Sequence, residues 1–149
     1  PDAVLISSEQ KKGLEEFIKT LKKAGVTLVI DIRLNNTSQL AGYSKGKDLE
    51  FLLKVGFGIG YCHELQLAPT KEILDQYKKD NDWSRYEKDF TELLEKNKFN
   101  LLKLWEELSE NQTLCLLCTE STPERCHRRL IAEFWAKNLK EPQIDIYHL

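Results

Sequence analysis

Apolar residues follow two alternating patterns along the 149-residue chain. Between the polar segments lie short apolar runs that are typical of strands buried on both faces, at residues 3–6, 27–32, 59–63, 113–118 and 144–148. Elsewhere apolar residues recur every three or four positions, which predicts helices with one buried stripe at 9–23, 47–55, 70–80, 84–96, 101–108 and 123–138. Gly25 follows the first helix, at a position where glycine tolerates a left-handed backbone.

The alternation of strands and helices predicts an α/β fold. We expect one three-layer domain over residues 1–149, with a mostly parallel sheet of about five strands flanked by helices. Three helices follow the third strand in succession, and we interpret them as a helical insertion packed on one side. Because ligands in such folds bind beyond the carboxyl ends of the strands, residues at those ends are candidates for function.

Composition narrows the class of protein. Lys and Arg total 22 against 24 Asp and Glu, and the resulting charge of −2 does not favour a protein that coats nucleic acid or membrane, although a small basic pocket for nucleic acid is compatible with it. No apolar run is long enough to predict a membrane-spanning helix. Four cysteines are too few for a disulfide scaffold, and no secretory signal is visible, so we expect a cytoplasmic protein. The sequence does not indicate the oligomeric state.

Two of the expected strands end in residues that are suited to ligand binding or catalysis. Asp31 and Arg33 close the second strand and, being two positions apart, point to the same side of it. His63 closes the third strand. Tyr43 lies in the polar loop after Arg33, where it either covers a bound ligand or is an ordinary half-buried ring of a surface loop.

The richest segment joins the fourth strand to the last helix. A helix start favours an anion, and Arg128 adds a forked cation there. Such surroundings lower the pKa of a nearby thiol, so Cys118 is a candidate nucleophile. Glu120 and His127 are candidate acid–base groups. Together these residues indicate a site for a small anionic, phosphate- or nucleotide-like ligand.

Structural roles for the same residues stay open. Asp31 is also suited to an internal ion pair with Arg33 or Arg128 that braces the strand ends. Cys118 is as compatible with a structural thiol as with a nucleophile, and Cys126 has the register of a buried apolar residue. A redox pair of these two thiols is a further alternative.

A metal site is the least favoured alternative. Cys115 and Cys118 have the spacing of a zinc knuckle, which Cys126 and His127 would complete. However, residues three apart in an extended strand face opposite ways, so Cys115 is expected to point into the core. We therefore predict no metal and no cofactor.

Several motifs resemble the family called domain of unknown function 488 (DUF488). The most specific runs from Cys118-Thr119-Glu120 through Pro123 to Cys126-His127-Arg128. The segment Asp31-Ile32-Arg33 and the segment Tyr61-x-His63 resemble its strand-end motifs, and Tyr147-His148-Leu149 resembles its last strand. The resemblance implies an α/β fold with these motifs around one cleft, and it implies no particular reaction. Asn36 and Gln39 replace a usual Pro and Arg, which disfavours a large polyanionic partner.

The sequence thus supports two functions. The first is an enzyme acting on a small anionic substrate, with Cys118, Glu120, Asp31 and His127 as catalytic candidates and Arg33, His63, Arg128 and Tyr43 as ligand-binding candidates. The second is a non-catalytic module that binds a nucleotide or a nucleic-acid end, with structural cysteines.

Overall fold

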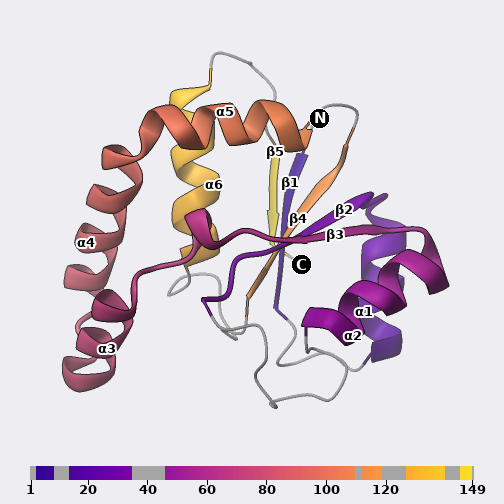
Figure 1. Ribbon diagram of the computed structural model, residues 1–149, viewed down its shortest axis with the longest axis horizontal. Helices are drawn as coiled ribbons and strands as arrows, with labels where there is room; N and C mark the ends of the chain where they lie inside the picture. Colours follow the sequence, from indigo (N-terminus) through magenta and orange to yellow (C-terminus); the bar gives the residue numbers. More distant parts are fainter. Residues whose placement is uncertain are drawn as a thin grey trace.

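The computed structural model describes residues 3–8, 14–34, 46–109, 112–118, 127–139 and 145–148. Within these residues one sheet has the strand order β3-β2-β4-β1-β5, and each neighbouring pair is parallel. The strands are β1 (Ala3–Ser8), β2 (Leu28–Asp31), β3 (Gly60–His63), β4 (Leu114–Cys118) and β5 (Asp145–His148). Parallel pairing brings the carboxyl ends of all of them to one edge of the sheet (Figure 1).

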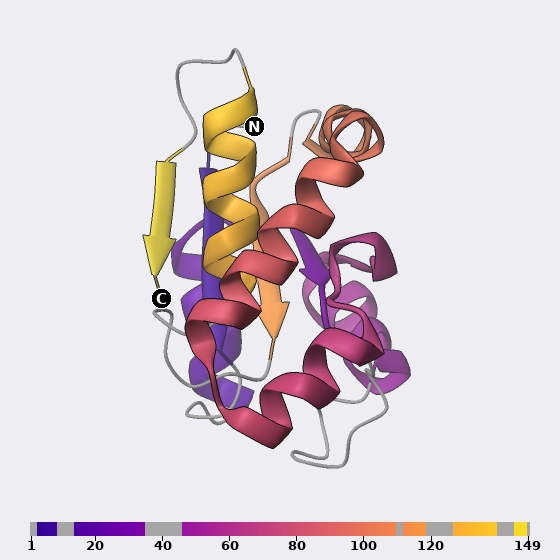
Figure 2. The same cartoon turned by 90° about the vertical axis from the view of Figure 1, so that its left-hand side faces the viewer.

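Helices cover both faces of the sheet, as Figures 1 and 2 show. One face carries α1 (Leu14–Lys23) and α2 (Gly46–Phe51), which continues into the π-helical turn η2 (Leu52–Gly56). The other face carries α3 (Lys71–Asp80), α4 (Trp83–Lys96), α5 (Lys98–Ser109) and α6 (His127–Asn138). A short 3₁₀ turn, η3 (Leu65–Leu67), connects β3 to α3.

Alternating side chains of the central strands build two separate cores. Ile30 of β2 and Leu116 of β4 pack with the helices α4, α5 and α6. Val29 of β2 and Cys115 of β4 pack with α1 and α2 on the opposite face. All four side chains are fully buried, which explains why both strands are continuously apolar in sequence.

The predicted α/β class and the parallel sheet flanked by helices are confirmed. The successive helices α3, α4 and α5 contribute to a single core, as expected of an insertion. The helix expected at 47–55 differs, because its second half widens into a π-helix that buries Leu53 beside Leu49. The expected first turns at 9–13 and 123–126 lie outside the described residues. None of the described helices is long and apolar enough to span a bilayer.

The turn after α1 gives a test of backbone conformation. Gly25 has a φ of 73°, so Gly25→Ala forces a side chain into the left-handed region and is expected to cost about 1–2 kcal/mol of unfolding free energy. Gly56 is the matched control, because an added Cβ there meets only Leu52 at an ordinary 3.7 Å. Gly56→Ala should be neutral or stabilising by up to about 1 kcal/mol. Urea unfolding followed by circular dichroism measures both, and equal losses would contradict the assignment.

Candidate functional site

A buried ion pair closes β2. Asp31 is fully buried and Arg33 is 4% exposed. The Arg33 guanidinium donates from Nε to Asp31 Oδ1 at 2.8 Å and from Nη2 to Oδ2 at 2.6 Å. The two side chains lie on the same side of the chain, as their spacing predicts, and the two-residue separation lets the arginine fold back onto the carboxylate.

The Asp31 carboxylate receives two further hydrogen bonds. The backbone N–H of Arg33 donates to Oδ1 at 3.2 Å, and the hydroxyl of Tyr61 donates to Oδ2 at 2.6 Å. Each carboxylate oxygen therefore accepts two hydrogen bonds from the protein. A carboxylate held in this way is well placed to orient the guanidinium that is bonded to it.

Two histidines hold the backbone at the same strand end. Nε2 of His127 lies 2.9 Å from the carbonyl oxygen of Ile32, and Nε2 of His63 lies 2.6 Å from the carbonyl oxygen of Arg33. Since a carbonyl oxygen only accepts, each imidazole donates from Nε2. Consecutive peptide groups are thus fixed by side chains from two different elements, α6 and β3.

Arg128 adds a second buried guanidinium at this end of the sheet. It follows His127 in the first turn of α6 and is 2% exposed. In Figure 2 this first turn lies at the end of the sheet toward which the arrowheads of β4 and β5 point. Burial raises the pKa of the Cys115 thiol in β4 to about 12, and the positive charge of Arg128 opposes this rise. That opposition places the guanidinium within electrostatic reach of β4.

The structure brings together five of the residues that the sequence selected. They are Asp31, Arg33, His63, His127 and Arg128. Cys118 is the last residue of β4, opposite Ser8 of β1, but its side chain lies outside the described structure. Tyr43, Glu120 and Cys126 also lie outside the described residues. The redox pair and the zinc site, both alternatives to the predicted site, are therefore not tested by the structure, and the described residues contain no cluster of metal-ligating groups.

Tyr61 belongs to the network and was not selected from the sequence as a site residue. The signal was available, because Tyr61 precedes His63 by two positions on the same strand and so shares its side. Its register opposite Val29, one pleat before Asp31, brings the hydroxyl to the carboxylate.

Glu64 is a second residue that the sequence analysis did not select. Its N–H donates to the carbonyl oxygen of Asp31 at 3.0 Å, which places it at the same strand ends. Burial raises the pKa of its carboxyl, the charge of Glu107 adds to this rise, and His63 opposes it. It is therefore a further titratable group beside His63.

A row of aromatic rings approaches the site from the core between the sheet and the helices α3 to α6. The Phe90 and His127 rings meet edge to face, with centroids 5.5 Å apart. Behind Phe90 the rings of Tyr86, Trp83 and Tyr77 continue in contact, and Trp83 stacks on Tyr86 at 4.8 Å. This packing fixes the His127 ring from the side of α4.

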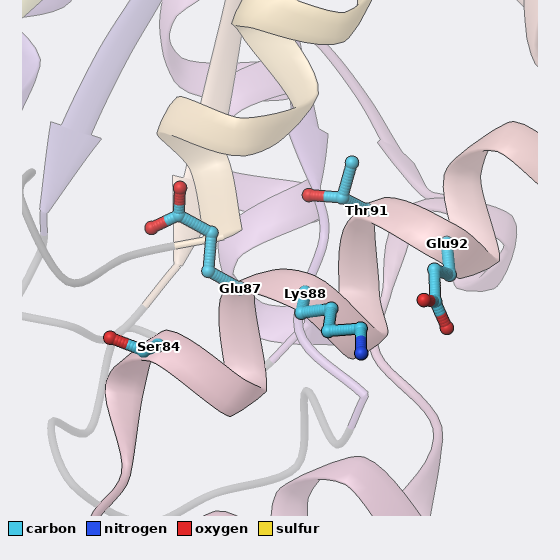
Figure 3. Close-up of a pocket in the computed structure, with 5 residues that line it drawn as sticks. All are labelled: Ser84, Glu87, Lys88, Thr91 and Glu92. Atoms are coloured by element: carbon cyan, nitrogen blue, oxygen red, sulfur yellow. The ribbon is translucent and has the colours of Figure 1, made fainter.

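A shallow hollow on the outer face of α4 is separate from this network (Figure 3). It is lined by Ser84, Glu87, Lys88, Thr91 and Glu92. One of its carboxylates, Glu87, pairs with Arg129 of α6 at 3.2 Å, while that arginine also pairs with Glu133. We place the candidate site at the strand ends, because the buried charges and the imidazoles gather there.

Comparison with known proteins identifies one family. The family model described as "Domain of unknown function DUF488" matches residues 13–135, which include every described residue of the network. No curated protein and no solved structure matches the chain.

The Asp31–Arg33 pair is open to a test of stability. Asp31→Asn leaves a buried guanidinium without its carboxylate, and we expect a loss of about 3–5 kcal/mol in unfolding free energy. The control is Asp75→Asn, which removes one partner of the exposed Lys71–Asp75 pair and should change stability by less than about 0.5 kcal/mol. Urea unfolding distinguishes them, and a loss at Asp31 as small as at Asp75 would exclude a structural role for the pair.

The described thiols are expected to be unreactive in the folded protein. Burial raises the pKa of Cys62 to about 12, with the charges of Glu64 and Asp31 adding to the effect, and burial raises that of Cys115 equally. Both stay protonated at pH 8.5, where a free thiol is about half ionised. Iodoacetamide labelling read by mass spectrometry should modify them only after unfolding. Equal labelling rates with and without urea would contradict these pKa values.

Proposed function

The chain belongs to the DUF488 family of domains of unknown function, and we propose that it binds a small anionic, phosphate- or nucleotide-like substrate beyond the carboxyl ends of β2, β3 and β4. We further propose that it acts on this substrate as an enzyme. The family description assigns no reaction, so the proposal rests on the chemistry of the strand ends.

The burial of two guanidinium groups at one strand edge carries the proposal. Arg33 and Arg128 are each less than 5% exposed; Arg33 follows the end of β2, and Arg128 lies in the first turn of α6. A protein buries arginine where its forked N–H donors serve recognition or an ion pair, because guanidinium desolvation is costly. The positive end of the α6 dipole lies at the same edge and supports binding of an anion.

In the proposed enzyme, each residue has a distinct role. Arg33 and Arg128 hold the anion, while Asp31 orients Arg33. Cys118 is the candidate nucleophile, and Glu120 is the candidate acid or base. His63 and His127 shape the site from either side, with Tyr43 as the candidate cover over the ligand. The reducing cytoplasm that the sequence favours would keep such a thiol available.

A non-catalytic binding module is the second candidate. It is favoured by the hydrogen bonds of Asp31 and His127, which direct these two candidate catalytic groups to the protein itself. In that case the same arginines recognise a nucleotide or a nucleic-acid end, and the cysteines are structural. Neither function requires a metal or cofactor.

Anion binding is tested by calorimetric titration with inorganic phosphate and with AMP. Arg128→Gln should weaken binding at least about tenfold, since it removes charge-assisted hydrogen bonds. The neighbouring Arg129→Gln is the matched control, because Arg129 pairs with Glu87 and Glu133 on the outer side of α6 and should leave affinity unchanged. No binding by the wild type, or equal losses in the two variants, would refute the proposed site.

Labelling of Cys118 separates the enzyme from the binding module. A nucleophilic thiol should react with iodoacetamide well below pH 8.5, and phosphate should protect it. Its modification should then abolish turnover in a screen of phosphorylated substrates. A Cys118 that is inert throughout the pH range, in a protein that still binds phosphate, would favour the binding module instead.

A further inference from the structure

We infer that Tyr61 is a positioning residue, which acts through Asp31 to hold the Arg33 guanidinium in the orientation that receives the anion. The inference rests on the proposed function for the identity of the ligand. It assigns to Tyr61 a specific task in addition to its place in the core.

The hydroxyl of Tyr61 donates to the carboxylate oxygen of Asp31 that has the shorter hydrogen bonds. Asp31 Oδ2 accepts from Tyr61 at 2.6 Å and from Nη2 of Arg33 at 2.6 Å. Arg33 contributes the other two hydrogen bonds to the carboxylate, from Nε and from its own backbone, and both reach Oδ1. Among the described residues, the phenol is therefore the donor to this carboxylate that comes from outside the segment formed by Asp31 and Arg33.

Because Tyr61 comes from a different strand, its hydrogen bond to Asp31 has a different effect from those of Arg33. Bonds between Asp31 and Arg33 allow the two side chains to move together, because both belong to the same end of β2. Tyr61 belongs to β3, and its ring packs in the core under α1 and α2 with Leu49 and Leu53. The hydroxyl is thus attached to a rigid part of the protein, and it fixes the plane of the carboxylate relative to the sheet.

The orientation of the Asp31 carboxylate determines that of the Arg33 guanidinium. A bidentate pair is planar, so a carboxylate plane that is fixed also fixes the plane of the arginine bonded to it. His63, from the same strand as Tyr61, holds the carbonyl of Arg33 and so restrains the backbone of the same residue. Side chain and backbone of Arg33 are consequently both restrained from β3.

Removal of the hydroxyl alone tests the inference. Tyr61→Phe keeps the buried ring and its apolar contacts, so the fold should persist, which circular dichroism checks. The control is Tyr77→Phe, a half-buried tyrosine of α3 that packs with Trp83 and Tyr86 in the opposite core. The probes are inorganic phosphate for affinity and the Nε–H resonance of Arg33 for its order in the ligand-free protein.

We expect Tyr61→Phe to speed exchange of the Arg33 Nε–H with water and to weaken phosphate binding about tenfold, because a hydrogen bond to a charged group that orders the arginine is lost. Tyr77→Phe should change neither quantity. In an Arg33→Lys background, Tyr61→Phe should have no further effect on phosphate affinity, because the group that it positions is absent.

The outcomes separate this inference from the proposed function. Equal loss of affinity on adding Tyr61→Phe to wild type and to Arg33→Lys would overturn the inference, since a merely structural tyrosine acts independently of Arg33. Unchanged Nε–H exchange in Tyr61→Phe would overturn it as well. If the wild type binds no phosphate, the proposed function fails and so does the anion-receiving task of Tyr61, whereas faster exchange would still establish that Tyr61 orders Arg33.

Discussion

The burial of a complete ion pair at the end of β2 is the constraint on which the candidate site depends. Asp31 and Arg33 are both withdrawn from water, and neither is tolerable there without the other. The pair converts a flexible arginine into a fixed one, at the cost of requiring every acceptor position of the carboxylate to be satisfied. Tyr61 and the Arg33 backbone meet that requirement, so the protein itself holds the ion pair in place.

The sheet determines which groups can meet there. Within β2, Val29 and Ile30 serve opposite cores, so side chains from the two helical layers are separated along most of the strand. At its carboxyl end this separation stops. Tyr61, from the core under α1 and α2, reaches Asp31, while His127 of α6 reaches the Ile32 carbonyl. At the carboxyl end of β2, side chains from both layers therefore contact adjacent residues of the chain.

Local patterns in the sequence left open whether Asp31 pairs with Arg33 or with Arg128, but they were sufficient for the fold class and for the approximate position of each described strand. Those features depend on spacing within one element. The partners of Tyr61, His63 and His127 depend on the register between strands and on the position of α6, which no local spacing encodes. The widened turn η2 was missed for a related reason, because the burial of Leu53 that it achieves is a property of the assembled core.

The strand order has a consequence for how the protein acquires its structure. β1 lies between β4 and β5, and both of these partners come about a hundred residues or more later in the chain. During synthesis, β1 therefore stays unpaired until the segment between β1 and β4 has emerged from the ribosome. Contacts this distant in sequence make folding slow, and an apolar strand edge left open meanwhile is a target for aggregation and for chaperones.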